Sequence, residues 1–312
     1  MSGLPDGVYT VVPTPFDAEG SLDLASLERL VGFLVDRGIA GLLVLGVLGE
    51  APKLLADERR AVVETAIAAA AGKPVIVGVT HASTAGTTAL AQAAEQAGAA
   101  AVLVAPPRLE RAAGQQVLVD YFTEVATSTS LELVLQDHPA SSGVELPPLL
   151  IAQLAEEVPQ LTTVKLEDPP TPLKLGRLRA ACPSLKLYGG LGGVYLLEEL
   201  GRGANGTMTG FAFPELLVQI HAAHASGDLE GAEQAFFAAL PLIRFEFQEA
   251  VGLALRKRIY RLRGAIESDH VREPTTALDA ASEQELERLL RHVAKTPTGT
   301  AVGIQWRPTV SS

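Results

Sequence analysis

Eight short apolar segments alternate with longer segments of helical periodicity through residues 8–225 of this 312-residue chain. The apolar segments are expected to be strands at residues 8–12, 41–45, 74–79, 100–105, 131–136, 161–165, 185–188 and 206–208. The helices between and after them are expected at residues 22–37, 57–71, 84–97, 115–127, 147–157, 173–181, 194–201 and 214–225. Eight such units match an α/β fold of the (β/α)8 TIM barrel type in number and size, and uninterrupted apolar strands are typical of a parallel sheet covered on both faces. An open doubly wound sheet is the alternative, which the regular spacing disfavours.

The sequence after residue 227 keeps a helical period but contains no further convincing strand. We therefore expect residues 1–227 to form the barrel and residues 228–295 to form a C-terminal helical extension. Residues 296–312 contain Gly, Pro and the only tryptophan, Trp306, and are expected to be an irregular tail.

The composition excludes several classes of protein. The formal net charge of −11 argues against a nucleic-acid partner, because proteins that bind nucleic acids usually present a basic face. Residues 1–20 lack a basic segment followed by an apolar core, and the longest apolar stretch, residues 39–49, is too short to span a bilayer, so we expect neither a secretory signal nor a membrane partner. A single cysteine, Cys182, excludes an intrachain disulfide and fits a reducing compartment. The expected location is the cytoplasm.

Lys165 is the first candidate catalytic residue, because it ends the expected strand 161–165 and precedes a proline-containing loop. Reactive groups of (β/α)8 enzymes lie at the carboxyl ends of the strands. A partly desolvated lysine at such a position loses its proton more readily and can attack a ketone to form a Schiff base. The alternative is that Lys165 only forms an ion pair with Glu167 or Asp168 at the end of its strand.

Other strand ends supply residues that could surround a substrate. The turn at residues 46–50 follows the second strand, and the backbone N–H groups of Val47 and Leu48 could bind a carboxylate. Further candidates at the barrel mouth are Glu50, His81, Gln136, Asp137, His138, Glu167, Tyr188, Gly189 and Thr207, with Arg108 and Arg111 as candidates for binding an anion. A lone histidine near a strand end is more often structural than catalytic, which weighs against His81 and His138, and a solvated position is favoured for Arg111.

Two patterns suggest a cofactor or a metal, and both are rejected. Residues 201–206 spell Gly-x-Gly-x-x-Gly, but they lead from a helix into a strand, the reverse of a dinucleotide-binding loop. His221 and His224 lie three residues apart on an expected helix without an evident third ligand. We therefore expect no cofactor and no bound metal.

Several motifs follow one another along residues 7–295 in a familiar order. They are Val12-Pro13-Thr14-Pro15-Phe16, Gly46-x-x-Gly49-Glu50, Asp57-Glu58-Arg59, Gly98-Ala99, Pro139, Lys165 and Gly203-Ala204-Asn205-Gly206-Thr207. In this order they resemble the dihydrodipicolinate synthase and N-acetylneuraminate lyase superfamily of class I aldolases and dehydratases. The resemblance implies a TIM barrel with C-terminal helices, usually a homotetramer. It also implies a lyase that forms a Schiff base between Lys165 and a small-molecule 2-oxo acid.

The chain departs from this superfamily at several positions. Members commonly carry two threonines where this chain has Val47 and Leu48, and a proton-relaying tyrosine where it has Gln136. A second tyrosine, donated across a subunit interface, has no clear counterpart in residues 106–109, and the arginine that binds aspartate semialdehyde in the synthase is Ser141. Gln136 cannot act as a general base, because a neutral amide does not titrate. These departures argue against dihydrodipicolinate synthase activity.

Three segments of the chain are more similar to another branch of the superfamily. Residues 136–143, Lys165-Leu166-Glu167 and residues 206–211 are similar to 2-keto-3-deoxy-sugar-acid dehydratases such as L-2-keto-3-deoxyarabonate dehydratase, which also lack the strand-five tyrosine. On this resemblance, Schiff-base formation would be followed by loss of the C3 proton and the C4 hydroxyl, with Gln136 orienting the substrate. The candidates for carrying the proton are His81, His138, Glu167, Tyr188 and the substrate's own carboxylate. Pyruvate-dependent aldol cleavage, binding of a 2-oxo acid without turnover, and metal-dependent chemistry are the alternatives.

Overall fold

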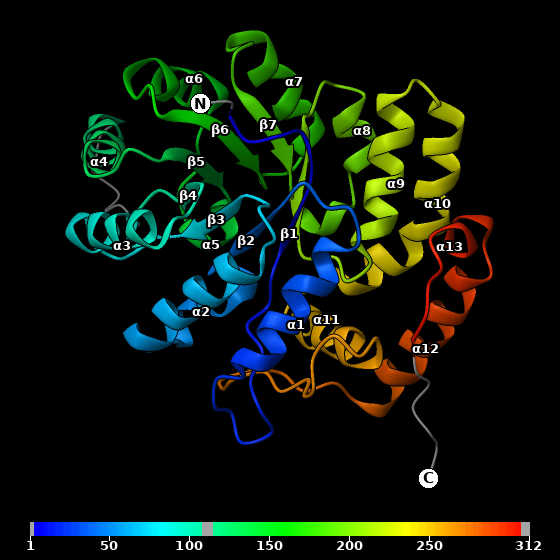
Figure 1. Cartoon of the computed structure of the whole chain (residues 1–312). Helices are drawn as coiled ribbons and strands as arrows, with labels where there is room; N and C mark the ends of the chain where they lie inside the picture. The colour runs from blue at the N-terminus through cyan, green and yellow to red at the C-terminus, as the bar shows by residue number, and fades with distance from the viewer. Residues whose placement is uncertain (1–2, 108–114, 307–312) are drawn as a thin grey trace.

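A closed barrel of eight parallel strands forms the centre of the computed structural model, which describes residues 3–107 and 115–306 (Figure 1). The strands, in their order around the barrel, are β1 (Gly7–Val11), β2 (Gly41–Val44), β3 (Val75–Gly78), β4 (Ala101–Val104), β5 (Glu132–Asp137), β6 (Leu161–Leu166), β7 (Lys186–Gly189) and β8 (Gly206–Thr209). β8 pairs in parallel with β1 and so closes the sheet. The predicted (β/α)8 barrel is therefore confirmed.

Helices cover the outside of the barrel. Those between and after the strands are α1 (Leu24–Val35), α2 (Ala56–Ala69), α3 (Thr84–Ala97), α4 (Gln115–Thr127), α5 (Pro139–Ser142), α6 (Pro148–Glu157), α7 (Thr171–Ala181), α8 (Leu196–Leu200) and α9 (Pro214–Ala225). The C-terminal helices are α10 (Leu229–Glu246), α11 (Gly252–Leu262), α12 (Ala280–Ala294) and α13 (Pro297–Ala301). Among the described residues, no helix is both long enough and apolar enough to cross a membrane.

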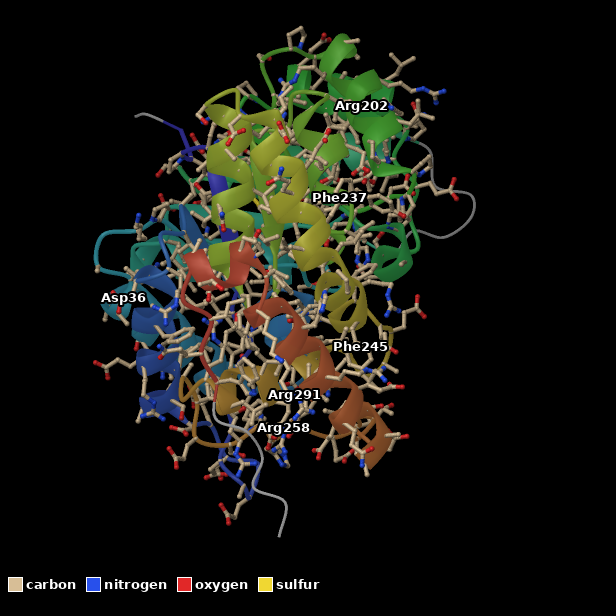
Figure 2. All side chains as sticks on the ribbon, turned by 90° about the vertical axis from the view of Figure 1, so that its right-hand side faces the viewer. Asp36, Arg202, Phe237, Phe245, Arg258 and Arg291 are labelled. Atoms are coloured by element: carbon tan, nitrogen blue, oxygen red, sulfur yellow. The ribbon has the colours of Figure 1, made fainter. Side chains whose placement is uncertain are left out.

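The C-terminal helices add a layer on one side of the barrel. α10 packs against α9, and α12 packs in turn against α10, as both views of the molecule show (Figure 1; Figure 2). On α10, Phe245 is buried whereas Phe237 is exposed on the outer surface (Figure 2). The predicted C-terminal helices are thus confirmed, while the domain boundary at residue 227 stays a prediction.

The expectation of an irregular tail after residue 295 was wrong in its first part. Thr296 caps the short helix α13 by accepting a hydrogen bond from the N–H of Gly299, and Pro297 is its first residue. Threonine and proline favour a helix start at these two positions. Ile304 is buried and Trp306 packs against the main core, so this segment is part of the folded molecule.

Apolar side chains fill the barrel interior, and two tyrosines close its amino-terminal end. Tyr9 and Tyr188 both donate a hydrogen bond to the carbonyl oxygen of Pro5, each at 2.9 Å, and their rings meet edge to face with centroids 5.5 Å apart. The side chains packed with them are Leu4, Val11, Leu43, Ile76, Ala101, Leu103, Val134 and Met208. Tyr188 pairs with Lys165 across the sheet, but its hydroxyl reaches the end of the barrel opposite the carboxyl ends of the strands. Its assignment to substrate binding and proton transfer was therefore wrong.

Candidate active site

Three polar side chains meet at the carboxyl ends of β5 and β6. Lys165 pairs with Gln136 in the register of these strands, and Glu167 is the first residue after β6. The Nζ of Lys165 lies 3.0 Å from Oε2 of Glu167, and Nε2 of Gln136 donates to the same oxygen at 2.9 Å. Lys165 is only 5% exposed and Gln136 only 4%. We call these three residues the Lys165 cluster.

The absence of a side chain at Gly190 makes room for the carboxylate of this cluster. A Cβ at Gly190 would lie 2.4 Å from Cγ of Glu167, which is closer than van der Waals contact allows. Burial alone would raise the pKa of Glu167, but the Lys165 ammonium, the nearby His138 ring and the hydrogen bond from Gln136 hold that pKa below its ordinary value. Glu167 is therefore an anion at neutral pH, positioned against the Lys165 amine.

A cavity of about 590 Å³ opens at this end of the barrel, with Gln136 in its wall. Val47 and His81, which the sequence also predicted as site residues, line it together with Ser141 and Arg59. The rest of the wall comes from Leu45, Gly46, Ala51, Pro52, Leu54, Gly78, Thr80, Ala82, Leu103, Ala105, Pro106, Pro107 and Ser142. A mostly apolar wall with a few convergent polar groups is typical of a small-molecule site.

The turn after β2 forms one side of this cavity. It contains the short 3-10 helix η1 (Val47–Gly49), which lies between two residues in the left-handed conformation, Leu45 (φ 56°) and Glu50 (φ 54°). Val47 is 54% exposed, whereas the side chain of Leu48 packs against the barrel interior. The turn therefore presents Gly46 and the exposed Val47 to the cavity.

The two histidines predicted at the mouth lie on different sides of it. Nδ1 of His81 accepts a hydrogen bond of 3.1 Å from the backbone N–H of Ser83. The Nδ1 of His138 lies 2.8 Å from Oγ of Ser141, and the His138 ring contributes to the electrostatics of Glu167. His138 thus borders the Lys165 cluster, and His81 lines the cavity.

Asp137 faces away from the mouth, and its assignment to substrate binding was wrong. It follows Gln136 on β5, and successive side chains of a strand point to opposite faces. On the outer face, Oδ2 of Asp137 lies 2.6 Å from Nζ of Lys174 in α7, which also contacts Asp168 at 2.8 Å. Burial raises the pKa of Asp137 to about 6, although Lys174 opposes this shift.

Glu50 is also turned away from the cavity, so its predicted contact with substrate was wrong. The residue is 3% exposed, and its Oε1 accepts a hydrogen bond of 2.6 Å from Nζ of Lys257 in α11. The carboxylate is part of a buried contact between the turn and the C-terminal helices.

Thr207 and Gly189 support the wall behind the mouth. Thr207 precedes Met208, which fills the barrel interior, so Thr207 points outward and its Oγ1 donates to the carbonyl of Gly189 at 3.3 Å. A Cβ at Gly189 would lie 1.7 Å from Oε2 of Glu199. Glycine is required here because it accommodates the buried Glu199 carboxylate, which accepts a 2.5 Å hydrogen bond from Oγ1 of Thr171. The prediction that the Thr207 side chain contacts substrate was wrong, and Gly189 has no side chain with which to do so.

Glu199→Gln should remove part of the pH dependence of stability. Burial raises the pKa of Glu199 from 4.5 to about 7. Between these pH values the folded protein holds a proton that the unfolded chain has lost, so the free energy of unfolding falls as pH rises through this window and has no further Glu199 contribution above it. The difference between wild type and Glu199→Gln should therefore change by about 2–3 kcal/mol between pH 4.5 and 7.5. Urea denaturation at a series of pH values measures this, and parallel curves for the two proteins would contradict it.

Arg59 lines the cavity, yet it was not predicted as a site residue. It lies in the first turn of α2 and donates from Nη1 to the carbonyl of Ala51 at 3.3 Å. Its motif, Asp57-Glu58-Arg59, is visible in the sequence, but only the fold brings that helix end to the mouth. Arg108 and Arg111, the basic residues that were predicted to bind anions, lie outside the described residues.

Comparisons with known proteins find relatives that cover nearly the whole chain. The sequence model of the Dihydrodipicolinate synthetase family matches residues 4–293. L-2-keto-3-deoxyarabonate dehydratase of Azospirillum brasilense is 33% identical over 293 residues, which cover 92% of this chain and 94% of the relative. A 4-hydroxy-tetrahydrodipicolinate synthase of Thermotoga maritima is 32% identical over 295 residues, covering 93% of this chain and 97% of the relative.

Solved structures are similar over nearly the whole chain. Dihydrodipicolinate synthase from Rhodopseudomonas palustris superposes with a TM-score of 0.89 at 35% identity, covering 94% of this chain and 99% of the other. The prophage protein YagE of E. coli K12, solved in complex with pyruvate, gives a TM-score of 0.86 at 27% identity, covering 93% of this chain and 99% of the other. The relatives thus include both dehydratases and synthases.

Proposed function

The chain belongs to the dihydrodipicolinate synthetase family of lyases, and we propose that within it the chain is a Schiff-base-forming 2-keto-3-deoxy-sugar-acid dehydratase. The observation that carries this proposal is the Lys165 cluster, in which one carboxylate contacts both the candidate nucleophile and Gln136. The name and coverage of the Azospirillum relative support the same activity.

The tyrosines of the chain support dehydration over synthase activity. The described residues include all five of them, and none of the hydrogen bonds made by their hydroxyl groups is to Lys165. Tyr9 and Tyr188 are bound to Pro5 at the far end of the barrel. Tyr260 is fully buried in α11, Tyr121 shares a hydrogen bond with Thr87, and Tyr195 precedes α8. A tyrosine relay to Lys165 of the kind that the superfamily resemblance implies for the synthase has no counterpart among these residues.

The proposed reaction starts with attack by the Lys165 amine on the C2 carbonyl. Glu167 accepts the ammonium proton as the free amine forms and returns it to the hydroxyl of the resulting carbinolamine, which leaves as water to give an iminium, so that Glu167 is a carboxylate again. The substrate carboxylate lies against the backbone N–H groups of Val47 and Leu48 in this proposal. Gln136 orients the substrate through its amide, because it has no proton to exchange at neutral pH.

Glu167 is the proposed base for the next step. With the iminium as electron sink, its carboxylate removes the C3 proton and an enamine forms. The enamine expels the C4 hydroxyl, which takes the proton from Glu167 and leaves as water. Hydrolysis of the remaining imine releases the product and regenerates the Lys165 amine.

A panel of 2-keto-3-deoxy sugar acids tests this function directly. The purified protein should release water from at least one of them. Mass spectrometry should then show an enzyme-dependent loss of about 18 mass units, the mass of one water, from the substrate. Pyruvate formation, measured with a coupled dehydrogenase, distinguishes aldol cleavage, which uses the same iminium but breaks the C3–C4 bond. Binding of pyruvate without turnover of any compound would instead indicate a 2-oxo-acid-binding protein.

The predicted homotetramer and cytoplasmic location stay predictions. The homotetramer comes from the resemblance, and the location from the composition.

A further inference from the structure

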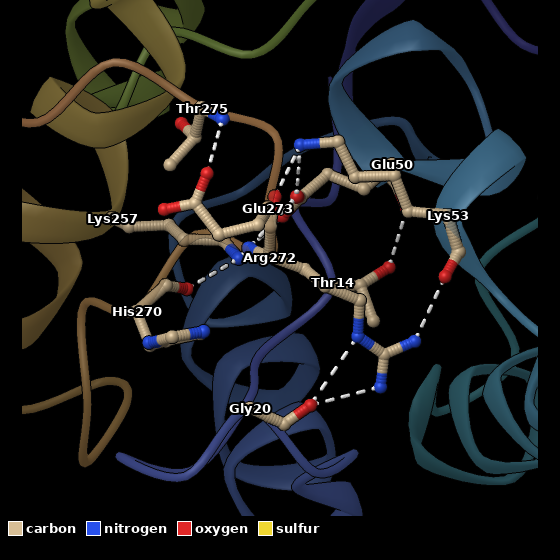
Figure 3. Close-up of polar contacts among 10 residues, drawn as sticks. Thr14, Gly20, Glu50, Lys53, Lys257, His270, Arg272, Glu273 and Thr275 are labelled. Atoms are coloured by element: carbon tan, nitrogen blue, oxygen red, sulfur yellow. Dashed lines mark hydrogen bonds and ion pairs between the residues drawn. The ribbon is translucent and has the colours of Figure 1, made fainter.

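A buried ion pair joins the turn after β2 to the C-terminal extension. Glu50 ends the turn, and its Oε1 accepts a hydrogen bond from Nζ of Lys257 at 2.6 Å, across 207 residues of sequence. The Lys257 side chain is 0% exposed and that of Glu50 2%. We call this pair the Glu50–Lys257 anchor (Figure 3).

The other atoms of the anchor are also occupied. Oε2 of Glu50 accepts hydrogen bonds from Nζ of Lys53 at 3.1 Å and from the backbone N–H of Arg272 at 3.2 Å. Nζ of Lys257 also donates to the carbonyl of His270 at 2.8 Å and lies 4.5 Å from the centre of the Phe16 ring. The Glu50 carboxylate is therefore committed to protein contacts and does not reach a substrate.

Arg272 fixes the surroundings of the anchor. Its guanidinium contacts both carboxylate oxygens of Glu58 at 2.7 Å, and it donates to the carbonyls of Lys53 and Gly20, each at 2.9 Å. From the other side, Oγ1 of Thr14 donates to the carbonyl of Gly49 at 2.7 Å. The carboxyl half of the turn is thus held by Thr14 from the loop after β1, by Lys257 from α11 and by Arg272 from the segment after α11 (Figure 3).

The amino half of the same turn faces the cavity. Gly46 and Val47 line it, and Glu50 lies only three residues after Val47, in a left-handed conformation that links η1 to the next helix. Any rotation of the Glu50 backbone therefore moves the Val47 and Leu48 amides. A buried charge that loses its partner either shifts the backbone or takes up water, so the anchor resists such rotation.

We propose that Lys257 is a positioning residue for the substrate carboxylate, acting through Glu50 on the amides of Val47 and Leu48. This inference rests on the proposed function, which assigns the substrate carboxylate to that turn. It gives the C-terminal extension a role in substrate affinity, although α11 supplies no atom to the Lys165 cluster.

Lys257→Met tests the inference, because methionine keeps the apolar length of lysine and removes its charge. Two carbonyl probes are compared by borohydride trapping on Lys165: pyruvate, which has the carboxylate, and hydroxyacetone, which lacks it. We expect the half-saturating pyruvate concentration to rise about 10- to 100-fold, with trapping by hydroxyacetone unchanged. KM for a turned-over 2-oxo acid should rise by the same factor, with kcat nearly constant.

Two further variants keep the test interpretable. Lys186→Met removes a lysine that contacts Asp6 at the amino-terminal end of the barrel, and it should leave both probes unaffected. Glu50→Gln removes the charge from the other side of the anchor and replaces one carboxylate oxygen, which accepts from Lys53 and Arg272 or from Lys257, with an NH2 donor. It should reproduce the selective loss of pyruvate if Lys257→Met does not fold.

The outcomes separate this inference from the proposed function. An equal loss for both probes, or no loss for pyruvate, would overturn the positioning role while leaving the Schiff base intact. A wild-type protein that neither probe labels would overturn the Schiff-base function, and the positioning role with it.

Discussion

Lys165→Met should lower kcat by at least about 10,000-fold, because no other described amine lies where the substrate carbonyl must bind. The Nζ of Lys165 is 3.0 Å from Glu167, and Gln136 of the same cluster lines the cavity at the barrel mouth. Methionine fills the same largely buried volume, so the fold should persist. Product formation from the best sugar acid and the melting temperature are measured together, which separates lost chemistry from lost structure.

Lys295→Met is the matched control, because Lys295 is exposed at the end of α12. Its kcat should equal that of the wild type. If Lys165→Met kept more than about a tenth of wild-type activity, an iminium on this residue could not be an obligatory intermediate.

Glu167→Gln should lower kcat by about 100- to 10,000-fold, while Lys165 still forms the Schiff base slowly because water can accept its ammonium proton in place of Glu167. Glutamine keeps the size and one acceptor oxygen for Gln136 and Lys165, but it cannot accept the C3 proton. Borohydride should therefore still trap substrate on Lys165 in this variant, whereas exchange of the C3 hydrogens with deuterated water should become slow.

The pH profile provides a second check on Glu167. The pKa of Glu167 is held below its ordinary value. The carboxylate form of Glu167 is therefore the main form at neutral and mildly acidic pH, and it is lost only when the pH falls below that lowered pKa. Protonation of Glu167 should therefore cause no fall in kcat between about pH 5.5 and 8. If Glu167→Gln retained full activity and His138→Asn did not, His138 beside the cluster would be the proton carrier instead.

The barrel was predictable because its signal is local. Each strand is a short apolar run between helical segments, and their number and regular spacing leave few alternative folds. The Lys165 cluster was partly predictable for the same reason. Lys165 and Glu167 are neighbours in sequence, and Gln136 ends the adjacent strand, so parallel pairing brings all three to one end of the sheet.

The facing of individual side chains was not predictable. Strands that are apolar on both faces lack the alternation that tells inside from outside, which is why Asp137 and Thr207 were assigned to the mouth although they point outward. Tyr188 does point into the barrel, but the direction of its hydroxyl depends on Pro5, which is distant in sequence.

The contact between Glu50 and Lys257 was not predictable from the sequence either. Lys257 had only a helical or loop context in the sequence, and 207 residues separate it from Glu50. Neither residue type nor spacing indicates such a contact before the C-terminal helices are packed on the barrel.

Reduction with borohydride in the presence of 2-oxo acids, followed by mass spectrometry of the peptides, tests the central claim most directly. Pyruvate and the panel of 2-keto-3-deoxy sugar acids are each incubated with the wild-type protein, and the site of the reduced adduct is read from the fragment spectra. The proposed mechanism predicts an adduct on Lys165, with the largest yield from the preferred substrate. An adduct confined to other lysines, or none with any compound that the protein turns over, would contradict it.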